Sequence, residues 1–298
     1  MEEQQQQAIQ EMQIEPEVKI GKFKASKMLV VESWNILKQD KEMMLFPIFS
    51  VITNVVCFVL ILVAFFFLAL GGNIAKLNSD VTARGLEIAL TFVLYFVSIS
   101  IATFFQAGVV SIAQGRMKGE DLSFSDGFNN AIGHIGKIVV WALISATVGT
   151  ILRFIAERSK LLGKIIVSLL GSAWSILTFF VVPVIVSEEL SIKDSLKKSA
   201  SIIGKTWGEA VIINIGVGLY FMLLSVIGIA VFVAALFVQN IIVIGIVSAL
   251  LVLYLMALMV ISSTLDTIFK IVLYEYANTG KVPQGFSPEV IAMAFGKK

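Results

Sequence analysis

The sequence has 298 residues, of which 57% are hydrophobic and 15% are charged, and its formal net charge is +2. A soluble chain carries about 45–50% apolar and about 25% charged residues, so this composition indicates a membrane protein. The small net charge excludes the strongly basic field typical of nucleic-acid-binding proteins. The single cysteine, Cys57, excludes an intramolecular disulfide and a cysteine-based zinc cluster.

Six apolar runs are long enough to cross a bilayer, since a helix needs about 20 apolar residues for about 30 Å of hydrocarbon. We expect spans over about 45–70, 87–113, 138–155, 165–186, 210–238 and 241–265. Around them we predict a disordered polar tail over 1–22, a helical membrane domain over 23–280 and a short C-terminal tail over 281–298. The predicted fold class is an all-α integral membrane protein with about six transmembrane helices.

Lysine and arginine concentrate in alternate connections between the spans, which predicts that both termini are cytoplasmic and that the protein lies in the cell membrane. One external turn breaks this bias, because Arg158, Lys160 and Lys164 lie in it and Arg153 comes just before it. Two explanations stay open. Either Arg153 extends outward to the interface, or spans three and four do not both cross fully.

Two segments of the chain are similar to each other. Leu122–Asp126 and Leu190–Asp194 match at three of five positions, and each has a Ser-x-x-Asp pattern that can cap a helix. Each precedes an amphipathic stretch and then an apolar span, and 26–38 resembles a third copy before span one. We therefore predict an internal repeat of amphipathic interfacial helix, span and return span. Transporter repeats often frame a binding site, although duplication of a helical hairpin with no transport role is the simpler explanation of the pattern.

The amphipathic stretches are expected on the cytoplasmic side, with apolar faces in the headgroup boundary. In the second copy Ile192, Leu196, Ala200 and Ile203 form the apolar stripe. The lysines lie largely off this stripe and are candidates for binding lipid headgroups. They are Lys193, Lys197, Lys198 and Lys205.

Few polar side chains lie inside the spans. Asn54, Gln106 and Asn214 each fall in a different span, where they can bond to neighbouring helices or line a solute path. Asp266, near the cytoplasmic end of span six, is a fourth candidate for that path. It can also simply pair with Lys270 one turn later. In span four Pro183 predicts a kink, because proline cannot donate to the carbonyl of Phe179.

Signatures of enzymes are absent from the sequence. His134 is the only histidine, so there is no H-E-x-x-H motif, and neither a G-x-S-x-G elbow nor a phosphate-binding P-loop occurs. We therefore predict a non-enzymatic protein with no catalytic residues, no cofactor and no metal.

Three segments carry a resemblance to a known family. They are Ser33–Pro47, then Val182–Glu188 with Asp194–Ser199, and Leu273–Ala277 with Gly285-Phe286. Together they resemble an uncharacterised family of prokaryotic multi-pass, six-span membrane proteins, over about 26–295. The middle segment is also similar to the membrane domain fused to some glycerophosphodiester phosphodiesterases. The resemblance implies the six-span fold and no known activity, and this chain has no phosphodiesterase domain.

Two functions follow as hypotheses. The first is a lipid-interacting or scaffolding membrane protein whose lysines contact anionic headgroups. The second is a transporter or permease for a small or lipid-like solute, with Asn54, Gln106, Asn214 and Asp266 along its path. The expected partners are membrane lipids, with other membrane proteins or a second copy of the chain as further possibilities, and no nucleic acid.

Overall fold

The computed structural model describes residues 22–70, 80–206, 209–289 and 291. Except for Lys22, the predicted disordered tail lies outside these residues. The elements are α2 (Lys22–Gln39), η1 (Lys41–Met44), α3 (Leu45–Leu70), α4 (Asp80–Met117), α5 (Phe124–Gly133), α6 (Ile135–Arg158), α7 (Leu161–Leu177), α8 (Val181–Ser187), α9 (Ile192–Thr206), α10 (Glu209–Leu236) and α11 (Ile241–Thr279). No strand occurs in these ranges, so the all-α prediction is confirmed.

Six of the helical segments are long and apolar enough to cross a membrane, as the sequence predicts. They are α3, α4, α6, α7 together with α8, α10 and α11. Their outer faces are apolar: Phe67 is 68% exposed, Leu169 65% and Ile241 82%. Such continuous apolar exposure is unfavourable in water and suits contact with lipid. The chain is therefore a multi-pass membrane protein.

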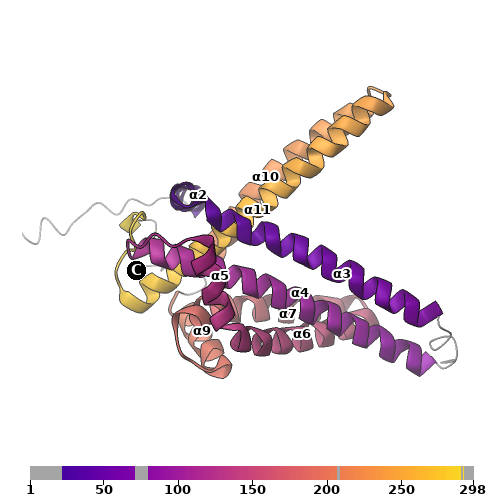
Figure 1. The fold of residues 1–298 in the computed structure, drawn as a ribbon, viewed down its shortest axis with the longest axis horizontal. Coiled ribbons are helices and arrows are strands. Elements are labelled where there is room, and N and C mark those ends of the chain that lie inside the picture. Colours follow the sequence, from indigo (N-terminus) through magenta and orange to yellow (C-terminus); the bar gives the residue numbers. More distant parts are fainter. Residues whose placement is uncertain (1–21, 71–79, 207–208, 290, 292–298) are drawn as a thin grey trace, which may run out of the picture.

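The spans form two arms that diverge from a common base (Figure 1). The larger arm contains α3, α4, α6 and α7, and the smaller one is the hairpin of α10 and the first half of α11. At the base, α2 and α8 pack against α11, whose residues from Thr264 onward are largely buried, while α5 packs against α4 and α9 against α8. We call this base the hub.

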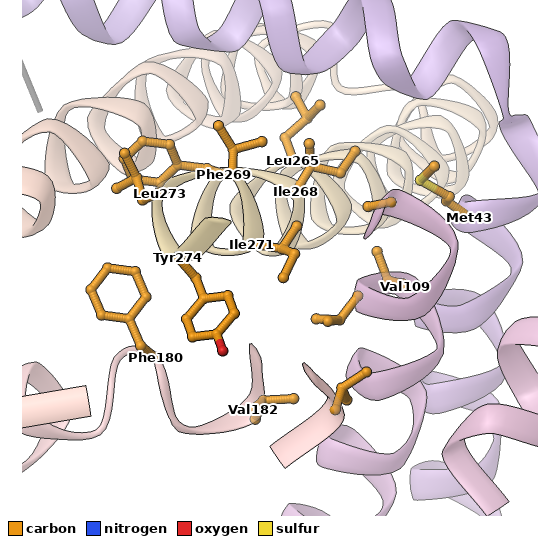
Figure 2. Packing of buried hydrophobic residues seen from close by; sticks show 14 of the residues in the cluster. Met43, Val109, Phe180, Val182, Leu265, Ile268, Phe269, Ile271, Leu273 and Tyr274 are labelled. Carbon is orange, nitrogen blue, oxygen red and sulfur yellow. The ribbon is translucent and has the colours of Figure 1, made fainter. Parts of the chain in front are cut away.

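The core of the hub is built on α11. Its residues before Thr264 are mostly exposed, whereas those from Thr264 to Tyr274 are mostly buried. Figure 2 shows Leu265, Ile268, Phe269, Ile271, Leu273 and Tyr274 pointing into a cluster that also contains Met43, Val109, Phe180 and Val182. Because α11 has 39 residues and rises about 1.5 Å per residue, it is long enough to cross the bilayer and still supply this core.

The order of the helices follows the predicted unit. A shorter helix is followed by two long ones in α2–α3–α4, in α5–α6–α7 and in α9–α10–α11. The predicted helix caps also form: Ser123 and Asp126 make a full capping box, and the Ser191 hydroxyl accepts from the amide of Asp194. That the three units arose by duplication stays a prediction.

Span four is interrupted, as Pro183 predicts. The helix stops at Leu177 and restarts at Val181, so that the proline lies in the first turn of α8. The interruption exposes backbone groups in a buried place, and Ser199 of α9 satisfies two of them. Its hydroxyl donates to the carbonyl of Leu177 at 2.7 Å and accepts from the amide of Phe180 at 3.1 Å. Ser199 is itself fully buried, so α9 stabilises the break between α7 and α8 through this side chain.

Replacing Ser199 with alanine is expected to destabilise the protein by about 1–3 kcal/mol, because the buried amide of Phe180 and the partly buried carbonyl of Leu177 each lose their partner. The measurement is thermal unfolding of the purified protein in detergent. Ser201→Ala is the matched control, since Ser201 lies exposed on the same helix. Equal effects of the two substitutions would contradict the role of Ser199 in stabilising the break between α7 and α8.

The apolar stripes of α5 and α9 pack against the protein. On α9, Ile192 and Leu196 lie in a cluster with Val181 and Ile185 of α8 and Trp141 of α6. On α5, the ring of Phe124 lies 4.5 Å from that of Phe46. These contacts account for the burial of the stripes. That the two helices also rest on the membrane surface stays a prediction.

The C-terminal end of the described chain returns to α2. Helix α11 ends at Thr279 and is capped by Gly280, whose φ of +69° is the left-handed conformation that favours glycine. Beyond it Phe286 and Ile291 are buried, and the Ser287 hydroxyl donates to the carboxylate of Glu32 at 2.6 Å. The described part of the predicted tail is thus part of the hub.

Candidate membrane-embedded pocket

Polar side chains from three spans meet where the two arms join the hub. A pocket of about 500 Å³ is lined by Asn54 of α3, Gln106 of α4 and Asp266 of α11. These are three of the four residues predicted to line a solute path. The fourth, Asn214, has its side chain outside the described part of the structure. Convergence of polar groups from separate spans is unusual in lipid, where each uncompensated group is costly.

The charged edge of the pocket is an ion pair within α11. The Lys270 ammonium lies 2.7 Å from the Asp266 carboxylate, which confirms the pairing expected from their four-residue spacing. The same ammonium lies 5.0 Å from the centre of the Phe179 ring, in a cation–π contact. Both members are partly exposed, Lys270 at 18% and Asp266 at 30% of the side chain, so a bound molecule can reach them.

Neutral polar groups and apolar walls complete the pocket. The Asn54 amide donates to the carbonyl of Ser50 at 3.0 Å, which leaves the side-chain oxygen of Asn54 as an acceptor. The walls are largely apolar and come from all three helices: Pro47, Val51, Val55, Ala102, Phe105, Val109, Met259 and Val260. A molecule with one polar end and an apolar body matches this division.

A second cavity adjoins the first one, between α10 and α11. It has a volume of about 340 Å³ and is lined by Val217 and Gly218 of α10 together with residues of α11. Met259, Ser263 and Asp266 line both cavities. Asp266 therefore borders both cavities, a position that its sequence context alone did not indicate.

The lysines predicted to bind headgroups have different surroundings. Lys193 is exposed, and Lys197 is exposed with its ammonium 3.4 Å from the Asp194 carboxylate. Lys198 instead turns inward: it bonds to the Glu188 carboxylate and to the Asn278 side chain at 3.0 Å. The side chain of Lys205 lies outside the described part of the structure. Lys193 and Lys197 are thus the described lysines of this set with most freedom to contact lipid.

Glu188 is the centre of a polar cluster that sequence reasoning did not identify. Its carboxylate accepts from both Lys198 and the Tyr274 hydroxyl, and its backbone carbonyl accepts from Lys137 at 3.0 Å. Burial raises the pKa of the Glu188 carboxyl, but the bonds from Lys198 and Tyr274 outweigh burial, so the pKa lies below its ordinary value. The cluster joins α6, α8, α9 and α11.

None of these groups forms an evident metal site. Among the residues that the structure describes, no three His, Cys, Asp or Glu side chains gather closely enough to hold a metal ion. The pocket offers one ion pair, two amides, the hydroxyl-bearing residues Ser50, Ser263 and Thr267, and apolar surface.

Comparison with known proteins places the chain in a class and then in a family. The six apolar helices define a multi-pass membrane protein. A family model matches residues 85–286, more than half of the chain, and the chain belongs to that family, a family of unknown function (DUF6159). No curated protein and no solved structure matches. The similarity to the membrane domain of glycerophosphodiester phosphodiesterases stays a prediction.

Proposed function

We propose that this chain is a non-enzymatic, lipid-interacting protein of the cell membrane, with both termini in the cytoplasm. The observation that carries the proposal is the pocket of about 500 Å³ in which Asn54, Gln106 and Asp266 converge between apolar walls. A phospholipid has the matching division, because its headgroup is charged and its acyl chains are apolar. In this proposal the headgroup lies against Asp266 and Lys270.

The position of the ion pair supports this orientation of the lipid. Asp266 and Lys270 lie just past Thr264, where α11 changes from an exposed helix to the buried core of the hub. Charged groups of membrane helices are favoured near such boundaries and disfavoured at the bilayer centre. Exposed Lys193 and Lys197 on α9 supply further positive charge at the hub for anionic lipids.

The proposal is tested by counting the phospholipids that the purified protein retains. The protein is equilibrated in dodecyl maltoside with phosphatidylethanolamine and phosphatidylglycerol at 3:1, and bound lipid is measured by native mass spectrometry. The double variant Asn54→Leu/Gln106→Leu removes two polar groups from the pocket. Since each polar contact in a membrane contributes about 0.6–2 kcal/mol, we expect lipid affinity to fall about tenfold.

Ser172→Leu is the matched control, because Ser172 is an exposed polar residue of α7 outside the pocket. It exchanges the same kinds of side chain on a lipid-facing surface. The control is expected to retain lipid as the unmodified chain does. Undiminished retention by the double variant, or equal loss in the control, would refute lipid binding in the pocket.

A second candidate function is a transporter or permease for a small or lipid-like solute. The observation that favours it is the pair of adjoining cavities along α11, which share Asp266. A solute that passed from one cavity to the other would meet that carboxylate. Reconstitution into phosphatidylcholine vesicles with a fluorescent phospholipid distinguishes the candidates, because only a lipid transporter accelerates movement of the probe between leaflets.

A further inference from the structure

Another pocket with polar walls, separate from the two cavities described above, lies at the end of the larger arm that is far from the hub. It has a volume of about 540 Å³ and is formed between α4 and α6. Arg84, near the start of α4, faces Arg153 and Arg158, near the end of α6, across this space. Arg158 is the last residue of α6, and Arg84 lies in the second turn of α4, which begins at Asp80. The pocket therefore lies where hydrocarbon gives way to the polar interface.

Arginine is the main source of charge in this pocket. Three guanidinium groups line it, against the two carboxylates of Glu87 and Glu157, which leaves one positive charge in excess. Glu157 is already engaged, because its carboxylate lies 2.7 Å from Nε of Arg153. Arg153 and Arg158 belong to the group of basic residues that breaks the charge bias of the sequence. The structure brings these two together with Arg84 from another helix.

Two of the three arginines are held in place, Arg158 by its own helix and Arg153 by Glu157 together with Tyr95 of α4. The Arg158 guanidinium lies 3.8 Å from the centre of the Phe154 ring, so the ring fixes its plane, and Glu157 does the same for Arg153. A guanidinium has five N–H donors in a rigid fork, and one carboxylate or one ring leaves several of them unused. Such a fork matches the geometry of a phosphate group.

Thr150 supplies an independent sign of a missing ligand. It lines the pocket and is only 8% exposed, and its buried hydroxyl oxygen has no hydrogen-bond partner in the described part of the chain. Buried helical threonines usually bond to the carbonyl four residues earlier, as Thr264 does with Val260 at 2.8 Å. A buried hydroxyl without a partner is costly, and a ligand in the pocket removes that cost.

We propose that this pocket binds a phosphate group, with Arg84 and Arg158 as the charged donors and Thr150 as the neutral one. The inference goes beyond the proposed function, since the site lies at the other end of the larger arm and shares no residue with the first pocket. The phosphate can belong to a lipid headgroup in the adjoining leaflet or to a free phosphate ion. The chemistry of recognition is the same for both.

The test uses the full chain purified in dodecyl maltoside and two probes, inorganic phosphate and dihexanoyl phosphatidylglycerol, each titrated by isothermal calorimetry. We expect saturable binding of at least one probe. Arg84→Gln/Arg158→Gln is expected to weaken that binding at least tenfold, since each charge-assisted bond to phosphate is strong. Lys160→Gln/Lys164→Gln is the control: it removes two charges beside the pocket but not in it, and affinity should change less than twofold.

Thr150→Val separates a ligand contact from a structural role. The substitution keeps the shape of the side chain and removes an oxygen that has no internal partner, so the fold should be as stable as before or more so. Phosphate affinity should nevertheless fall several-fold. If Thr150 only fills space, affinity will not change, and the assigned role is wrong.

The two probes distinguish the source of the phosphate. Binding of both, or of inorganic phosphate alone, identifies a general phosphate site, and binding of the lipid alone identifies a headgroup site. Absence of saturable binding for both probes overturns the proposal, as does equal loss of affinity in the lysine control. Because Asn54→Leu/Gln106→Leu leaves this pocket intact, failure of the first site and failure of this one are separate results.

Discussion

Replacing Gly108 with alanine is expected to destabilise the protein by about 1–3 kcal/mol, because an added methyl group overfills the core. A β-carbon at Gly108 would lie 2.1 Å from Cε1 of Phe46, much closer than van der Waals contact allows. The Phe46 ring cannot move aside, since it is fully buried and packs on Phe124 and near Gly127. Thermal unfolding in detergent measures the loss.

A second substitution tests that explanation. Phe46→Leu alone loses packing, but combined with Gly108→Ala it provides room for the methyl group, so the two effects should partly cancel. Gly136→Ala is the control, because nothing lies within 4 Å of a β-carbon there. If the double variant is less stable than the sum of the single variants predicts, the steric explanation fails.

Replacing Glu188 with alanine is expected to cost about 1.5–3 kcal/mol, the usual contribution of hydrogen bonds to a charged group, since the side chains of Glu188 and Lys198 are 20% and 30% exposed. The ammonium of Lys198 and the hydroxyl of Tyr274 would both lose the acceptor that they share. Glu189→Ala is a close control. Glu189 is 94% exposed and pairs only at the surface, with Lys137 at 3.3 Å, so its loss should cost less than about 1 kcal/mol.

The same carboxylate gives the stability a pH dependence. The pKa of Glu188 is lowered in the folded protein, so the unfolded chain binds the proton more readily. The contribution of Glu188 is therefore present above the ordinary carboxyl pKa of 4.5 and is lost as the pH falls below it. In the variant Glu188→Gln this part of the acid destabilisation should be missing. An identical profile for the variant and the unmodified chain would contradict the assigned role of the pair.

Much of the architecture is predictable because it follows from local properties. The length of the apolar runs determined the six spans, and the Ser-x-x-Asp patterns marked the starts of α5 and α9. Pro183 marked the interruption of span four for the same reason. The backbone groups left by the interruption need a hydrogen-bond partner, and the hydroxyl of Ser199 provides it. Ser199 lies 22 residues beyond Leu177, so this contact depends on tertiary packing.

The candidate site was predictable only in part. A polar residue inside an apolar run stands out, so Asn54, Gln106 and Asp266 could be selected, but nothing in their spacing shows that three helices bring them to one pocket. The cluster around Glu188 is harder still. Glu188 and Tyr274 are 86 residues apart, and each looks like an ordinary interfacial residue in its own segment.

The arginine pocket shows a different limit. The sequence presented Arg153 and Arg158 as an exception to the charge bias, and both explanations that it offered concerned the topology alone. A ligand site became a third explanation only when Arg84 was found on the facing helix, with the unpartnered hydroxyl of Thr150 beneath. The sequence pattern does not show which helices lie side by side, so it could not place Arg84 opposite Arg153 and Arg158.

The unbroken course of α11 has a mechanical consequence. This helix runs from Ile241 at the tip of the hairpin to Thr279 in the hub, whereas span four is divided into α7 and α8. A continuous helix is stiff along its length, so α11 moves as one rigid rod that pivots at the junction of the arms near Asp266. Any tilt of the hairpin, for example in a bilayer of different thickness, is transmitted to Tyr274 and Asn278 at the opposite end. The jointed α7–α8 pair can bend where α11 must rotate as one body.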